Sequence, residues 1–246
     1  MVIGMNFAVD RSHREFFFKH RFVEFEGLLS EEEADRLREA IFQTISNRLR
    51  KKPPLEESSA REVFLEGHNL FTDNKLVRKY VLRRNFAEIA SSLLGIRPLR
   101  IAFDQFIYTR ENESLFHEKE ISKVLPNEIS LHQMSSVEPV VCGCILNLAK
   151  QCSTAPAETF SIAQDMEMLI PIPSCPGHGI FFQVDAPISF ESLYAVPNQN
   201  LLLIVYGKDK MLYTKNDRDP HVHQLKKLGY VFGDKLKNET HPIIYG

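Results

Sequence analysis

The stretch LRIAFDQFIY, residues 99–108, decides the fold class of this chain. Every second residue from 99 to 107 is apolar except one glutamine: Leu99, Ile101, Phe103, Gln105 and Ile107. Alternation of this kind predicts a β-strand. Upstream of Pro98 the apolar spacing is helical, so the change of period divides a helical part from a β part.

Downstream of this strand the alternating pattern continues. We predict further short strands at residues 129–131, 137–144, 159–163, 168–172, 179–184, 188–195 and 201–206. Helices followed by many strands indicate the α+β class, with helices packed on a β-sandwich or barrel. The segment 110–127 is long enough for a lid or a mobile connection. We expect a single domain, 1–246, with a helical part at 1–97, a β-barrel core at 98–215 and an extension at 216–246.

Two helices are predicted in the first part. Ser30 and Glu33 form a capping box, so a helix begins at Ser30, and it ends before Pro53. A second helix runs from about residue 73 to a C-cap at Gly95. Its exposed face carries four cations, Arg78, Lys79, Arg83 and Arg84. We expect this face to be solvated, because four charges neutralise few phosphates.

Bulk composition excludes several classes of protein. The chain has 246 residues, with Lys+Arg 30 against Asp+Glu 32, so no positive excess attracts nucleic acid or an anionic membrane. We find no signal peptide and no apolar run long enough to span a membrane, and we expect a cytoplasmic protein. Cys142, Cys144, Cys152 and Cys175 lack a disulfide framework, so we expect mostly buried thiols. Cys142 and Cys144 share one face of a strand, which leaves a redox pair open as an alternative.

The turn Leu131-His132-Gln133-Met134 has the outline of a metal-binding site. A histidine followed two positions later by a carboxylate begins the iron-binding triad of two histidines and one acid. Met134 stands where the acid would be.

Five segments together resemble the phytanoyl-CoA dioxygenase-like proteins of the iron(II)/2-oxoglutarate oxygenase superfamily. They are residues 22–33, 104–108, 131–133, 176–182, and 228–234 with His241-Pro242, the last being similar to some bacterial members. The resemblance implies a double-stranded β-helix, a jelly-roll or cupin-like barrel, with N-terminal helices packed against it. It also implies iron(II) and 2-oxoglutarate as cofactors.

The chain departs from the pattern at the residues that carry the chemistry. The resemblance puts the second histidine at residues 188–190, which are Ile188, Ser189 and Phe190. It puts the cation that holds 2-oxoglutarate at Gln199 or Asn200, where neither side chain is charged. We therefore expect neither iron(II) nor 2-oxoglutarate to bind, and no cofactor.

Other histidines could supply replacement ligands. His221 and His223 alternate onto one face near Asp219, but a third ligand is not evident. We expect His178 to lie in a satisfied loop network. His68 and His117 are expected in polar loops, without a role in metal binding.

The favoured hypothesis is a diverged, non-conventional member of the oxygenase fold, not a 2-oxoglutarate dioxygenase, that binds an apolar or mixed small molecule. The pocket is predicted from six residues: His132, Met134, Gln105, Tyr108, Phe190 and Gln199. One alternative is an active metal-dependent oxygenase with a rearranged site. Another is a metal-responsive DNA-binding regulator that uses the basic second helix.

Overall fold

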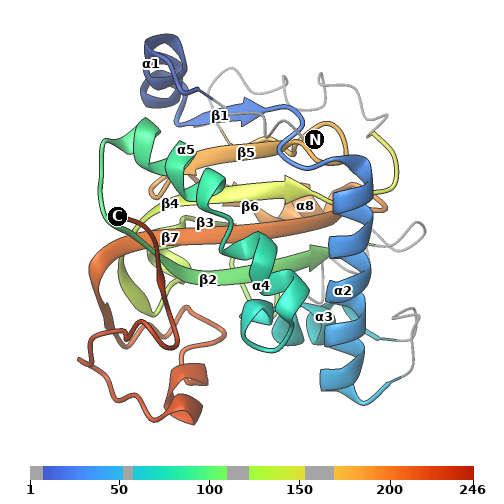
Figure 1. Cartoon of the computed structure of the whole chain (residues 1–246). Coiled ribbons are helices and arrows are strands. Elements are labelled where there is room, and N and C mark those ends of the chain that lie inside the picture. The colour runs from blue at the N-terminus through green and yellow to red at the C-terminus, as the bar shows by residue number, and fades with distance from the viewer. Residues whose placement is uncertain (1–7, 52–57, 110–121, 153–168) are drawn as a thin grey trace.

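A curled antiparallel sheet forms the centre of the molecule (Figure 1). The computed structural model describes residues 8–51, 58–109, 122–152 and 169–246. The main sheet has six strands in the order β1-β5-β4-β7-β2-β8. Their bounds are Phe22–Phe25 for β1, Leu99–Tyr108 for β2, Val137–Asn147 for β4, Gly179–Gln183 for β5, Asn200–Tyr213 for β7 and Ile243–Tyr245 for β8. Strands from both ends of the chain, β1 and β8, thus lie at the edges of the sheet.

A second, two-stranded sheet faces the first. It pairs β3, Glu128–Ile129, with β6, Ile188–Ser189. Side chains of both sheets meet in one apolar cluster, in which Ile129 and Ile188 pack with Ile145 and Leu203. The predicted α+β class and double-stranded β-helix are confirmed by this arrangement.

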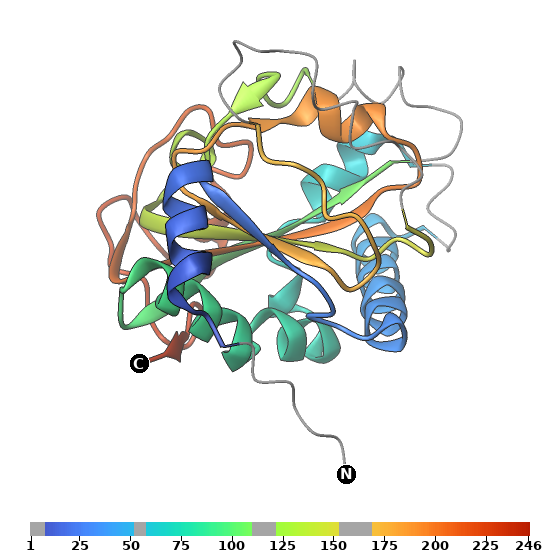
Figure 2. The ribbon, with the colours of Figure 1, turned by 90° about the horizontal axis from the view of Figure 1, so that it is seen from above.

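Helices lie on both sides of the main sheet (Figure 2). On one side are α1, Arg11–His20, α2, Glu31–Leu49, α4, Lys75–Val81, and α5, Arg84–Leu94, whose apolar faces form a first core cluster. On the other side are α3, Ala60–Glu66, α7, Leu131–Met134, and α8, Phe190–Ala195, which border the second cluster. The sheet is therefore buried on both faces, which explains why almost all of β2 is buried.

The helix α2 begins where the sequence predicts. The Ser30 hydroxyl accepts a hydrogen bond from the Glu33 amide at 3.1 Å, and the Glu33 carboxylate accepts one from the Ser30 amide at 3.1 Å. The helix ends at Leu49, because Arg50 adopts a left-handed conformation with φ 54. The expected end beside Pro53 lies outside the described residues.

The prediction of one long second helix is wrong. The structure breaks it into α4 and α5, because Arg83 has extended backbone with ψ 119. The Arg83 guanidinium bonds the Glu33 carboxylate at 3.3 Å on α2, which anchors the break to another helix. The predicted C-cap at Gly95 is confirmed, with φ 69.

Several strand predictions also need correction. The segment 188–195 is the two-residue strand β6 followed by the helix α8, and the segment 129–131 runs from the last residue of β3 to the first residue of α7. Residues 159–163 and most of the predicted lid at 110–127 lie outside the described residues, as does His117, and residues 169–172 are not a strand. In β2 a bulge between Ile101 and Phe103 moves the apolar register to the opposite face. Ile101 therefore packs under the helices, while Phe103 packs in the second cluster.

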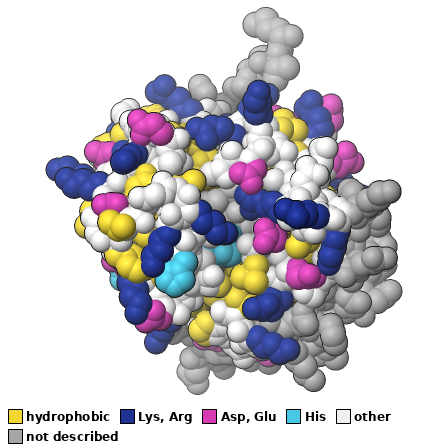
Figure 3. Space-filling view, turned by 90° about the horizontal axis from the view of Figure 1, so that it is seen from below, with side chains coloured by type: hydrophobic (Ala, Val, Ile, Leu, Met, Phe, Trp, Pro, Cys, Tyr) yellow, Lys and Arg dark blue, Asp and Glu magenta, His cyan; other side chains and the backbone are white. Residues whose placement is uncertain are grey.

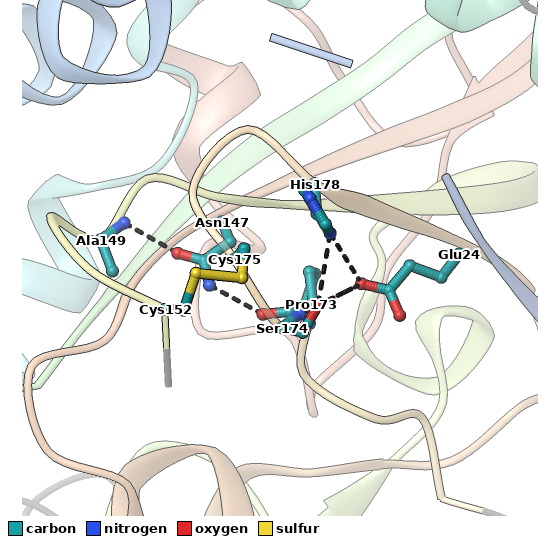
Figure 4. The surroundings of a disulfide bond; sticks show 8 residues. All are labelled: Glu24, Asn147, Ala149, Cys152, Pro173, Ser174, Cys175 and His178. Carbon is teal, nitrogen blue, oxygen red and sulfur yellow. Dashed lines mark hydrogen bonds and ion pairs between the residues drawn. A yellow bond between two sulfur atoms is a disulfide. The ribbon is translucent and has the colours of Figure 1, made fainter. Parts of the chain in front are cut away.

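The four cysteines separate into two pairs. Cys142 and Cys144 are free and fully buried, as predicted, and burial raises the pKa of the Cys142 thiol to about 12. Cys152 and Cys175 form a disulfide, so the expectation of thiols there is wrong (Figure 4). The two cysteines lie in the loops that follow β4 and precede β5, and these loops meet where the two strands pair. The Asn147 side chain donates to the Pro173 carbonyl at 2.7 Å and holds the loops together.

No helix in the described part of the chain combines the length and the apolar character needed to cross a membrane.

Candidate functional site

The turn predicted from the metal motif is the short helix α7. The side chain of Gln133 accepts a hydrogen bond from the Ser130 amide at 3.2 Å, so it turns back to cap the helix. The imidazole of His132 is exposed, whereas Met134 is buried in the second apolar cluster. The two motif positions therefore lie in different environments, one in solvent and one in the core.

The position of the second histidine is also apolar. Ile188 and Phe190 are each only 2% exposed and belong to the same cluster as Met134. Phe190 packs edge-on against Phe64, with ring centroids 6.0 Å apart. These side chains offer a thioether and hydrocarbon where iron(II) requires imidazole and carboxylate donors. The residues present do not fit the metal, and no group of three metal-binding side chains occurs in the described part of the chain.

The region expected to hold 2-oxoglutarate has no suitable cation. Gln199 is buried, and its main chain is tied to Thr109, whose hydroxyl accepts from the Gln199 amide at 2.8 Å. Lys208 and Lys210 on β7 are exposed. An amide cannot neutralise a buried carboxylate, so the residues at these positions do not fit the cosubstrate.

The six predicted pocket residues are dispersed. Gln105 and Met134 line one small pocket, and the other four lie elsewhere. Tyr108 packs on the helix side of the sheet against Phe42, with ring centroids 5.4 Å apart. Gln105 and Tyr108 are an odd number of positions apart on β2, so their side chains point to opposite faces of the sheet.

The pocket lies between β2, the start of β4 and the C-terminal extension. Its space is about 20 Å³, enough for one water-sized group. Its polar lining residues are His68, Asn69, Gln105, Ser135, Ser136, Tyr213, Asp219, His221, Gln224 and His241. Figure 3 views the molecule from the side on which the C-terminal extension lies, where histidine side chains appear among cationic and anionic ones.

Two histidines that the sequence placed apart stack in this pocket. The rings of His68 and His221 are 4.0 Å apart and 9° from parallel. The expectation that His68 sits isolated in a polar loop is wrong, because it is 8% exposed and stacks on a residue from the extension. The expected pairing of His221 with His223 is not seen, since His223 is exposed. No local motif marks His68, so sequence reasoning had no signal for it.

Neighbouring amides fix the tautomer of each ring. Gln105 donates both amide hydrogens, to the Phe64 carbonyl at 2.8 Å and the Phe106 carbonyl at 2.9 Å, so its oxygen must accept. That oxygen is 3.3 Å from Nδ1 of His68, which therefore carries the proton. The Gln224 amide nitrogen is 3.3 Å from Nδ1 of His221, which therefore accepts and leaves the proton on Nε2.

Burial keeps these imidazoles neutral. It lowers the pKa of His68 well below its ordinary range, and a charge on His221 would lower it further. Burial and the nearby Arg48 guanidinium lower the pKa of His221 to about 3. Burial and Arg100 lower the pKa of His241 to about 4. At neutral pH the pocket thus presents uncharged rings.

The other histidines and the basic helix are engaged within the chain. Nδ1 of His178 lies 3.3 Å from the Ser174 hydroxyl and 3.5 Å from the Glu24 carboxylate, the loop network that was predicted (Figure 4). The guanidinium of Arg78 lies over the Phe71 ring at 5.7 Å, and that of Arg84 lies over the Tyr245 ring at 5.3 Å. These two cations therefore pack on aromatic rings of their own chain.

Comparison with known proteins identifies relatives by structure alone. No family model and no curated protein matches the sequence. The non-heme alpha ketoglutarate dependent carbocyclase SnoK from nogalamycin biosynthesis matches with a TM-score of 0.64 and 13% identity, over 96% of both chains. The epimerase SnoN of the same biosynthesis matches with a TM-score of 0.65 and 12% identity, over 96% of this chain and 98% of SnoN. CytC3, solved with Fe(II) and alpha-ketoglutarate, matches with a TM-score of 0.55 and 11% identity, over 84% of this chain and 80% of CytC3. The chain therefore has the fold of the non-heme α-ketoglutarate-dependent enzymes.

Proposed function

We propose that this chain uses the oxygenase fold to bind a small molecule and does not catalyse iron- and α-ketoglutarate-dependent oxidation. The observation that carries the proposal is the burial of Met134, Ile188 and Phe190 in one apolar cluster at the motif positions. Fold and chemistry are separable, and the residues that differ here are those that would supply the chemistry.

Coordination chemistry supports the loss of the metal site. His132 alone would leave iron(II) with one protein nitrogen, on an exposed ring. A thioether is a poor ligand for iron(II) and adds no negative charge to offset that of the ion. The fold match and the motif resemblance agree on the scaffold, while membership of the phytanoyl-CoA dioxygenase-like group remains a prediction from the five segments.

A binding role is supported by the pocket beside Met134. Its walls combine apolar side chains, including Phe103, Met134 and Leu225, with a few buried polar groups. Such a mixture can orient the polar end of a ligand. Because the space of about 20 Å³ holds one water-sized group, the rest of the ligand lies outside it.

The test is a titration of the purified protein with iron(II) and α-ketoglutarate. We expect no binding heat, no thermal shift and no succinate, while an active enzyme such as SnoK, assayed in parallel, shows all three. The His132→Ala variant is the matched control and should retain the same trace metal content as the wild type. Stoichiometric iron with succinate formation, both lost in His132→Ala, would refute the proposal and favour the rearranged oxygenase.

The DNA-binding alternative has less support. The helix on which it depends is broken at Arg83, and Arg83 itself bonds Glu33. The remaining cations neutralise too few phosphates for tight binding.

A further inference from the structure

Three buried side-chain polar atoms of the pocket lining have no hydrogen-bond partner among the described residues. They are Nε2 of His221, Oδ1 of Asn69 and Oγ of Ser136. His221 is only 8% exposed, so solvent does not reach its ring freely. Buried polar groups in proteins are almost always paired, which indicates that a group from outside the described residues completes these three.

The His221 and Asn69 atoms are complementary, and the Ser136 hydroxyl can donate or accept. Gln224 leaves His221 with a proton on Nε2, so this atom donates. Oδ1 of Asn69 can only accept. A group that satisfies both atoms must accept one hydrogen bond and donate another. We propose that this pocket binds a neutral ligand group that both donates and accepts, a hydroxyl or a carboxamide.

Charges around the pocket favour a neutral group. The Arg48 guanidinium is fixed beside it by the carbonyls of Glu66 and His68, each at 2.6 Å, and would repel a cation. On the other side Asp219 lines the pocket, held by the Ser136 amide at 2.9 Å, and its carboxylate would repel an anion. The Arg48 charge is already paired with the Asp73 carboxylate at 2.7 Å, and the Asp219 carboxylate already accepts from the Ser136 and His221 amides, so neither group is available as the ion-pair partner of a charged ligand.

Size and walls define the rest of the ligand. A space of about 20 Å³ holds the polar end alone, so further ligand atoms must extend toward the opening. Phe103, Met134 and Val137 line the same pocket and offer apolar contact to a carbon chain. The ligand class is therefore a small alcohol or primary amide with an apolar body.

This inference deepens the proposed binding role and rests on it for its biological meaning. The site itself depends only on His221, Asn69 and their neighbours. Its test uses four probes of similar size that differ in charge: methanol, formamide, formate and methylammonium. The readout is the ring nitrogen and proton NMR signals of His68 and His221 at neutral pH and constant ionic strength.

We expect methanol and formamide to shift these signals with saturation in the millimolar range, as befits ligands of two or three heavy atoms. Formate and methylammonium at equal concentration should leave them unchanged. His221→Phe keeps an aromatic ring beside His68 but removes the donor, and should weaken formamide binding at least tenfold. His223→Phe removes a neighbouring exposed ring and is the matched control, with unchanged affinity.

Asn69→Gly is a second variant, which removes the acceptor while its backbone, at φ 52, suits glycine. It should also weaken formamide binding, read on His68 and His221 even if His221→Phe does not fold. The inference is overturned if no probe binds, if charged probes bind as well as neutral ones, or if Asn69→Gly binds as the wild type does. The iron titration is independent, so oxidation activity with intact formamide binding would overturn only the proposed function.

Discussion

Acidification should destabilise this protein through its buried histidines, and His221 allows the effect to be measured. Its pKa is about 3 in the folded chain, against an ordinary value of 6.5. The unfolded chain binds a proton below pH 6.5, whereas the folded chain does not until about pH 3. The contribution of His221 to the free energy of unfolding is therefore full above pH 6.5 and is lost progressively as the pH falls.

The magnitude follows from the proton affinities. At pH 5, protonation of this one ring stabilises the unfolded form by roughly 2 kcal/mol, because each pH unit below 6.5 contributes about 1.36 kcal/mol. Asp104 acts in the opposite direction, because burial raises its pKa to about 7 and the folded chain binds that proton first. The pH dependence of the free energy of unfolding therefore combines groups that act in opposite directions. Only a comparison between variants isolates the contribution of His221.

The assay is urea unfolding of the wild type, His221→Phe and His223→Phe at pH 7 and pH 5. We expect the stability difference between wild type and His221→Phe to shift by roughly 2 kcal/mol in favour of the variant at pH 5. His223→Phe controls for the replacement of an exposed histidine in the same segment by phenylalanine. A pH-independent difference between wild type and His221→Phe would show that His221 is not buried as described, and the tautomer argument would fail with it.

Three further perturbations test the fold. Cys152→Ser should lower the free energy of unfolding by about 3 kcal/mol, since the disulfide to Cys175 closes a sequence separation of 23 residues, and a reductant should have no further effect on the variant in urea unfolding. Gly143→Ala should cost roughly 1 to 3 kcal/mol in the same assay, because an added Cβ would lie 2.2 Å from the Phe182 ring; a neutral result would contradict the packing of β4 on β5. Ser30→Ala should cost about 1 kcal/mol by removing the α2 cap, whereas Ser30→Asp should retain most of the wild-type stability.

Short-range features of the fold could be predicted from sequence. The capping box at Ser30 and the C-cap at Gly95 involve residues within one helical turn, so their identities suffice. The alternation from Leu99 to Ile107 predicted a strand where β2, Leu99–Tyr108, lies. The same local reasoning failed at Ile101, since a bulge leaves the residue types of a strand unchanged while reversing the side to which they point.

The sequence alone also shows that the motif positions lack the metal-binding side chains. Met134 and Ile188 are not carboxylate and imidazole, whatever the fold around them. Only the structure showed that they pack in one apolar cluster and that His132 faces solvent instead of joining them.

What the sequence determined by itself is therefore the class of each segment and the identity of the groups at each motif position. The tertiary structure alone decided that Cys152 meets Cys175 and that His68 stacks on His221. Helix caps and strand alternation depend on neighbours a few residues away, so local sequence encodes them. Contacts between residues of distant segments depend on how the sheets and loops pack. The local pattern of a sequence does not determine these distances.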